Sequence, residues 1–238
     1  MDRLTGVAEL LDGPLDDPAA LEANLRDLAR INRLTGGARL SERAIDALRA
    51  PQAVAAVDQP ATILDVGTGA ADIPLALLAR ARDEGRPLAI TATDSRPEIL
   101  AAARRAQPAL ERSADLELAI ADGRALPYPD GAFDIAHASL VLHHLAPAEA
   151  VAFLRELRRV ARRGIVVNDL VRGRPYWIGG WLLIHALAMS RYTRNDGPLS
   201  VRRAYTRQEM IGLLSAAELE PLASFVGFAG HRVAFAAR

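Results

Sequence analysis

Three aspartates stand beside short apolar runs in the middle of the chain. Asp65 precedes a glycine turn at 67–69, Asp94 ends the next apolar run, and Asp122 follows the third. If each run is a strand of one parallel sheet, the three carboxylates lie at the edge where such sheets bind ligands. The pattern predicts a site for a ligand that carries hydroxyl and amino donors.

The turn Gly67-Thr68-Gly69 gives the backbone the freedom to bend tightly and to approach a ligand at the start of a helix. Alone it is compatible with NAD, a flavin or a structural bend. A carboxylate at Asp65 repels a pyrophosphate, and Asp72 stands where a dinucleotide fingerprint has its third glycine. The two acids favour a ligand with an ammonium and a sulfonium, as in S-adenosylmethionine, over the alternative that they only cap a helix and bond to backbone.

The other two acids suit adenosine. Asp94, which Ser95 follows, can accept both hydroxyls of a ribose. Asp122, between Ala121 and Gly123, can accept from the exocyclic amine of an adenine.

Composition excludes several kinds of chemistry. The 238 residues contain no Cys and no Lys. Thiolate nucleophiles, Cys-ligated zinc, Schiff-base lysines and the P-loop lysine are therefore excluded. The net charge is zero, which disfavours nucleic acid as a partner. No metal site is predicted.

The pattern of elements is that of a doubly wound α/β fold. Helical spacing of apolar residues over 1–58 predicts a helical cap, and the α/β domain that carries the glycine turn is expected over 59–238. Short apolar runs predict strands, and the amphipathic stretches between them predict crossover helices on both faces of a mostly parallel sheet. The expected strands are 61–66, 88–93, 116–120, 133–138, 164–168, 220–228 and 231–236, and the expected helices are 71–84, 97–107, 148–162 and 207–217.

The last two runs are separated by Ala229-Gly230, which is too short for a parallel crossover, so we expect an antiparallel hairpin at the end of a seven-stranded Rossmann-like sheet. The alternation of strands and helices is interrupted between the fifth strand and the helix at 207. This insertion, at about 170–206, is predicted to be a lid.

These motifs resemble those of class I S-adenosylmethionine-dependent methyltransferases. The resemblance covers about residues 60–170. Leu140–Leu145 is similar to the ubiquinone and menaquinone type of small-molecule methyltransferase, and Ala71 departs from the family, which commonly has glycine there. The motifs are Asp65-Val66-Gly67-Thr68-Gly69, Asp94, Ala121-Asp122-Gly123 and Leu126–Asp134.

The resemblance implies positions for the cofactor. The turn at 67–69 would lie under the methionine moiety, with Asp65 toward its amino group and Ser139 near the methionyl end. Asp94 would hold the ribose and Asp122 the adenine amine.

Histidines are the candidates for proton transfer to or from an acceptor. His143 and His144 follow the fourth strand, and we predict His144 as the base, with His143, His185 and Asp169 as alternatives. The segment after the fifth strand is rich in aromatic residues and suits a hydrophobic aromatic acceptor. Trp177, Trp181 and His185 are its predicted acceptor contacts.

The sequence thus predicts methylation of a small aromatic or lipid-like acceptor, with a phenol or quinol oxygen as the target. C-methylation of the same ring, an NAD(P)-dependent oxidoreductase and a non-catalytic S-adenosylmethionine-binding protein are the alternatives. We expect a cytoplasmic monomer or homodimer with no membrane span, since the apolar stretch 175–189 is interrupted by glycines and a histidine and is short for a span.

Overall fold

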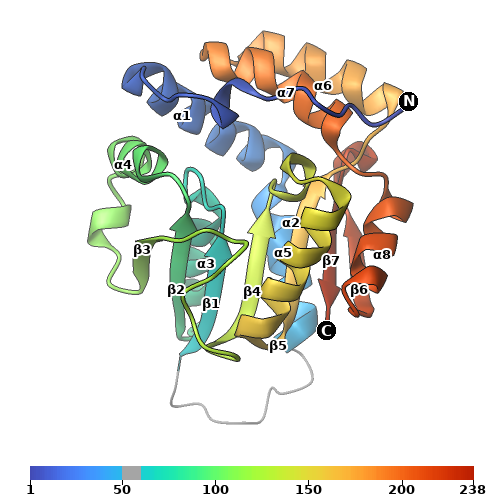
Figure 1. The fold of residues 1–238 in the computed structure, drawn as a ribbon. Helices are drawn as coiled ribbons and strands as arrows, with labels where there is room; N and C mark the ends of the chain where they lie inside the picture. Colours follow the sequence, from blue (N-terminus) through green and yellow to red (C-terminus); the bar gives the residue numbers. More distant parts are fainter. Residues whose placement is uncertain (50–59) are drawn as a thin grey trace.

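The computed structural model describes residues 1–49 and 60–238, and its centre is a seven-stranded sheet (Figure 1). The strand order is β3-β2-β1-β4-β5-β7-β6, and only β7 runs antiparallel to its neighbours. The strands are β1 (Ala61–Val66), β2 (Leu88–Asp94), β3 (Leu116–Ile120), β4 (Phe133–Ser139), β5 (Ala161–Leu170), β6 (Pro221–Val226) and β7 (Arg232–Ala237).

The helices cover both faces of this sheet and the edge where the parallel strands end. They are α1 (Pro18–Thr35), α2 (Gly37–Arg49), α3 (Asp72–Asp83), α4 (Pro97–Ala106), α5 (Pro147–Val160), α6 (Arg174–Leu187), α7 (Arg191–Arg203) and α8 (Arg207–Ala216). Short 3-10 turns are η1 (Leu10–Asp12), η3 (Leu110–Arg112), η4 (Leu142–His144) and η5 (Phe228–Gly230).

Side chains of the central strands alternate between two apolar layers. Ile165 and Val167 of β5 pack with α5 and α8, whereas Val166 packs with α2 and α3 on the other face. Because both faces are covered, consecutive positions of these strands carry apolar side chains, as at 165–167 of β5.

Three helices form a roof above the carboxyl ends of the parallel strands. Figure 1 shows α1, α6 and α7 lying together there, with the N-terminal segment running beside them. Leu21 and Leu25 of α1 are buried with Tyr192 of α7 and with Ala70 and Ala71 of the glycine turn. The roof therefore closes over the predicted cofactor edge of the sheet.

Local sequence sets the ends of α1. The Asp17 carboxylate accepts a hydrogen bond from the Ala20 backbone N–H at 3.0 Å, and Pro18 takes the first helical position. The helix ends at Gly36, whose φ of 73° is the left-handed conformation that glycine adopts most readily.

The predicted fold class is confirmed, including the seven strands, the antiparallel closing hairpin and the helical N-terminal part. Several boundaries differ by one to three residues. The largest difference is at β5, which begins at Ala161, where a helix was expected to continue to 162, because Ala161 already pairs with Phe133 of β4. Residues 170–206 fold mainly as α6 and α7. The predicted domain boundary at 58/59 lies outside the described residues.

Within the described ranges, every helix is too short or too polar to cross a bilayer.

Candidate functional site

The turn after β1 has the shape that the sequence predicted. Gly67 and Gly69 have φ values of 73° and 53°. A Cβ at Gly67 would lie 2.6 Å from Cγ2 of Val141, whereas a Cβ at Gly69 would meet open space. Gly67 is thus required by close packing, and Gly69 borders room for a ligand. Ala71, with φ of 53°, holds a left-handed conformation that costs an L-residue roughly 1–2 kcal/mol.

One buried polar group of this turn has no partner among the described residues. The Thr68 N–H donates to the Thr93 carbonyl at 2.8 Å, which ties the turn to β2. The Thr68 hydroxyl oxygen is buried and has no hydrogen-bond partner among the described residues. A buried hydroxyl without a partner is unfavourable unless a ligand or water satisfies it. The turn therefore has both the space and the unsatisfied polar group that a cofactor requires.

Asp94 lies at the end of β2, beside the turn. Its two carboxylate oxygens accept from the backbone N–H of Gly69 at 3.2 Å and of Arg96 at 3.1 Å. Burial raises the pKa of Asp94 above its ordinary value, although these two N–H bonds oppose the change. Each oxygen still has a lone pair free for a hydroxyl donor. Ser95 is exposed beside it.

Asp122 is the exposed member of the set. Its side chain is 45% exposed and forms an ion pair with Arg124 at 2.8 Å, and the bonds from Arg124 lower its pKa. The N–H of the buried Ala121 donates to the Asp94 carbonyl at 3.1 Å, which brings the two acids to one edge. Gly123 packs so closely on Val66 that a Cβ would lie 2.7 Å from it.

Asp65 is turned into the sheet. Its carboxylate lies 2.5 Å from Nδ1 of His137, its paired residue on β4, and both side chains are buried. Nε2 of His137 lies 2.7 Å from the Ser41 hydroxyl, which accepts from Asn168 at 2.8 Å. The resemblance placed Asp65 toward the amino group of the cofactor, whereas its closest polar partner in the structure is this histidine.

The buried chain of polar groups continues to Arg232 on β7. The Arg232 guanidinium donates to Asn168 at 2.7 Å, to Asn32 at 2.6 Å and to Ser139 at 2.6 Å. Burial lowers the pKa of Arg232 to about 10, opposed by nearby carboxylates. Asn32 in turn donates to Asp72 at 3.1 Å. The predicted residues Asp65, Asp72 and Ser139 are therefore joined in one network that anchors α1 and α2 to the sheet.

The His143-His144 turn is held against the cofactor edge by its backbone. Val141, which packs on Gly67, lies just before it. The Arg203 guanidinium donates to the His144 carbonyl at 3.0 Å, and both Arg3 and Tyr205 donate to the Leu145 carbonyl, at 2.8 and 2.7 Å. The roof and the N-terminal segment thus fix this turn beside the glycine turn.

His143 has the arrangement of a general base. Its Nδ1 lies 2.7 Å from the Asp169 carboxylate, which also accepts from the His143 backbone N–H at 3.1 Å. Burial favours a neutral Asp169, but the His143 ring and the hydrogen bonds outweigh it and hold the pKa of Asp169 below its ordinary value. No hydrogen bond to Nε2 of His143 is formed by residues 1–49 or 60–238. An ionised partner on Nδ1 and a free Nε2 suit proton abstraction.

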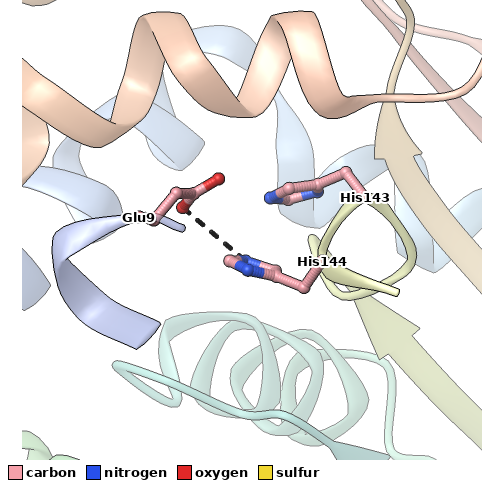
Figure 2. A group of neighbouring side chains, drawn as sticks. All are labelled: Glu9, His143 and His144. Atoms are coloured by element: carbon pink, nitrogen blue, oxygen red, sulfur yellow. Dashed lines mark ion pairs between the residues drawn. The ribbon is translucent and has the colours of Figure 1, made fainter. Parts of the chain in front are cut away.

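His144 points toward the N-terminal segment. Its Nδ1 lies 3.1 Å from Asp12 and its Nε2 lies 3.9 Å from Glu9, which comes from the opposite side (Figure 2). One donor atom each of Glu9, His143 and His144 falls within 4.8 Å of the others. Arg203 lies 2.7 Å from Asp12 and 3.5 Å from Glu9, so positive charge is already next to both carboxylates.

Sequence reasoning missed Glu9 and Asp12, and no local signal marks them. Burial raises the pKa of Glu9 to about 7, opposed by His144, Arg203 and a hydrogen bond from Ser200. Glu9 is 4% exposed. The N-terminal segment is therefore a wall of the site rather than a free tail.

We expect Glu9→Gln to change how stability depends on pH. The folded pKa of Glu9 is raised, so its stabilising contribution is complete below pH 4.5 and is lost as pH rises through about 7. As pH rises from 4.5 to above about 7, the unfolding free energy of the variant should therefore increase by about 3 kcal/mol relative to that of the parent. Urea unfolding at several pH values measures this gain. The exposed Glu111→Gln variant is the control, and a constant difference between Glu9→Gln and the parent would contradict the expectation.

The predicted acceptor contacts lie on α6, away from the buried layers. Trp181 is 42% exposed and stacks on His185, with ring centroids 4.2 Å apart. Trp177 is half-buried. Their contact with an acceptor stays a prediction.

Comparisons with known proteins identify the central part of the chain. Residues 63–164 match the family model described as "Methyltransferase domain". A stretch of 72 residues is 40% identical to the ubiquinone/menaquinone biosynthesis C-methyltransferase UbiE of Rickettsia akari (strain Hartford) and covers 30% of this chain and 29% of that protein. The chain thus matches less than a third of the length of such curated relatives.

Solved structures share the fold over a longer range. A SAM-dependent methyltransferase from Aquifex aeolicus superimposes with a TM-score of 0.63 and 20% identity, over 93% of this chain and 97% of that one. The magnesium protoporphyrin IX methyltransferase of Synechocystis PCC 6803 does so with a TM-score of 0.59 and 14% identity, over 86% and 84%. Residues 63–164 therefore match a methyltransferase domain, and the chain shares the fold of solved methyltransferases.

Proposed function

We propose that this protein transfers a methyl group from S-adenosylmethionine to the hydroxyl of a hydrophobic phenol or quinol. The observation that carries the proposal is the buried His143–Asp169 pair, 2.7 Å apart, whose turn packs against the glycine turn through Val141. A phenolic hydroxyl titrates near pH 10, so a positioned base assists its reaction at neutral pH.

The cofactor side of the site is assigned to the edge formed by β1, β2 and β3. Asp94 would accept from the ribose hydroxyls, the Gly67–Gly69 turn would lie beside the methionine part, and Asp122 would accept from the adenine amine. Asp65 would act through His137, with which it is paired, as a positioning residue. When bound, the cofactor supplies a methyl group on a sulfonium, whose sulfur leaves readily as a neutral thioether.

The residues of the chain then have to align the acceptor and remove its proton. Nε2 of His143 takes the proton from the acceptor hydroxyl, and Asp169 keeps the ring in the tautomer that leaves Nε2 free. The positive charge that develops on the His143 imidazole faces the ionised Asp169, which stabilises it. His144, the base that the sequence predicted, is the alternative, with Asp12 in the corresponding position.

C-methylation of the same ring is the second candidate. The curated relatives with a matching stretch are named as C-methyltransferases. An ionised phenol is nucleophilic at ring carbon as well as at oxygen, so one base serves both reactions. Incubation with phenols and quinols, followed by mass spectrometry and NMR of the product, separates a methoxy group from a ring methyl.

The test of the cofactor assignment is a calorimetric titration with S-adenosylmethionine and, separately, with NAD and NADH. We expect binding of S-adenosylmethionine only. Tighter binding of a nicotinamide cofactor would favour the oxidoreductase alternative, and cofactor binding without turnover of any acceptor would favour a binding protein.

In the same titration we expect Asp94→Ala to bind S-adenosylmethionine at least tenfold more weakly, because hydrogen bonds to a charged group contribute roughly 1.5–3 kcal/mol each. Asp83→Ala, an exposed carboxylate at the end of α3, is the control and should bind normally. Unchanged affinity in a folded Asp94→Ala variant would remove Asp94 from the site.

A further inference from the structure

The outer face of α6 exposes large apolar side chains in one continuous stripe. Ile178 is 53% exposed, Leu182 is 58% exposed, and Met189, just beyond the helix, is 76% exposed. Trp181 is 42% exposed between them. Positions 178, 182 and 185 follow helical spacing, and position 181 is one turn after 178, so these side chains share one side of the helix. Single exposed apolar residues are ordinary, but a continuous stripe marks an interaction surface.

The opposite face of α6 is already used. Ile184 is 8% exposed and lies against Gly197 of α7, so closely that a Cβ on Gly197 would clash with it. A Cβ at Gly180 would lie 3.6 Å from Val201, also of α7. Contacts on one side and exposure on the other leave the outer stripe without an intramolecular partner among the described residues.

The charged residues that flank this stripe in the sequence are arginines, and Asp27 of α1 is already bonded to the N–H groups of Met189 and Ser190. No Asp or Glu occurs between Asp169 and Asp196 in the sequence. Arg174 begins α6, and Arg191 and Arg194 follow its C-terminal end. All three are exposed, and Arg191 forms an ion pair with Asp17 at 3.5 Å. Both ends of an apolar stripe are therefore flanked by arginines.

This combination fits a membrane surface better than a soluble partner. An apolar face with Trp and Leu, flanked by arginines, lies in the plane of the interface with its apolar side among the acyl chains. Arginine forms bidentate bonds with phosphate. The 14 residues of α6 extend roughly 21 Å, which is too short to span the hydrocarbon core. The helix can therefore lie on a bilayer but not cross it.

We propose that α6 docks the protein on bilayers that contain anionic phospholipid, with Ile178, Trp181 and Leu182 inserted and Arg174, Arg191 and Arg194 at the phosphates. The docking itself requires no methyl transfer. Since α6 belongs to the roof above the carboxyl ends of the parallel strands (Figure 1), docking would bring that edge of the sheet to the surface in which lipid-like phenols dissolve.

The chain supplies its own probe, because its two tryptophans, Trp177 and Trp181, both lie in α6. The whole protein is mixed with vesicles of phosphatidylcholine alone, or of phosphatidylcholine and phosphatidylglycerol in a three-to-one ratio. With the anionic vesicles we expect co-sedimentation, a blue shift of the Trp emission and quenching by brominated acyl chains. Binding should weaken as salt is raised.

Two sets of variants test the contacts. Ile178→Ser with Leu182→Ser should weaken vesicle binding at least tenfold, given the free energy of burying such side chains. Arg174→Gln with Arg191→Gln should remove the preference for anionic vesicles. Leu222→Ser, which removes an exposed leucine from β6, is the control and should bind as the parent does.

Absence of co-sedimentation and of any change in Trp emission would overturn the proposal. So would normal binding by the Ile178→Ser, Leu182→Ser variant. Dimerisation in sedimentation velocity that this variant abolishes, without vesicle binding, would assign the stripe to a second copy of the chain instead. None of these outcomes depends on whether an acceptor is methylated, so failure of the docking and failure of the proposed activity are distinguishable.

Discussion

Replacing His143 with alanine is expected to lower turnover by roughly 10²–10⁴-fold while S-adenosylmethionine still binds normally. The reason is the pairing of Nδ1 with Asp169, which leaves Nε2 free for the proton of the acceptor. Single-turnover measurements of methyl transfer test the chemical step, and calorimetry tests the cofactor.

Matched variants decide between the two histidines. Asp169→Asn keeps the shape of the pair but removes its charge, and it should also slow methyl transfer, since the developing positive charge on the ring then lacks its partner. His144→Ala should have a smaller effect if His143 is the base. The reverse order would make His144 the base, as the sequence predicted. Near-normal turnover in both alanine variants would mean that the acceptor reacts already ionised.

Replacing Arg232 with methionine is expected to destabilise the fold by roughly 3–5 kcal/mol, the cost of breaking a buried charged network on one side. Methionine fills a similar volume, but Asn32, Asn168 and Ser139 would lose their donor. For a chain of this length the thermal midpoint should fall by roughly 6–20 °C. Calorimetric melting measures it.

Arg207→Met is the control for this measurement. Arg207 is exposed and donates to the Ser224 hydroxyl at 2.8 Å, so its loss should change stability by less than about 0.5 kcal/mol. Equal melting curves for the two variants would show that the Arg232 network contributes no stability. A gain in stability for Arg232→Met would show that the desolvation free energy of the guanidinium exceeds the stabilisation by its hydrogen bonds.

Features that depend on local pattern could be predicted from the sequence. Alternating apolar runs and a two-residue link gave the strands and the closing hairpin, and the glycine turn with Asp94 and Asp122 followed from where parallel strands end. These positions need only the order of elements along the chain. They do not need the packing of segments that are distant in sequence.

The partners of the buried polar groups could not be predicted in this way. Asp65 meets His137 because β1 and β4 pair in a particular register, although β2 and β3 come between them in sequence. Glu9 reaches His144 only because the N-terminal segment crosses the roof. Both contacts depend on tertiary packing, which overrides anything visible in a short window.

Arg232 lies in β7, which pairs with a strand on each side but is synthesised after both of them. The 200 residues between Asn32 and Arg232 take roughly 10–40 s to synthesise. Through that interval α1 and α2 have left the ribosome without their anchor, and their apolar faces have no finished sheet to cover. The nascent chain is therefore open to aggregation until β7 inserts between β5 and β6. We expect substitutions in β7 to reduce the yield of folded protein in cells by more than their effect on the melting of the purified protein suggests.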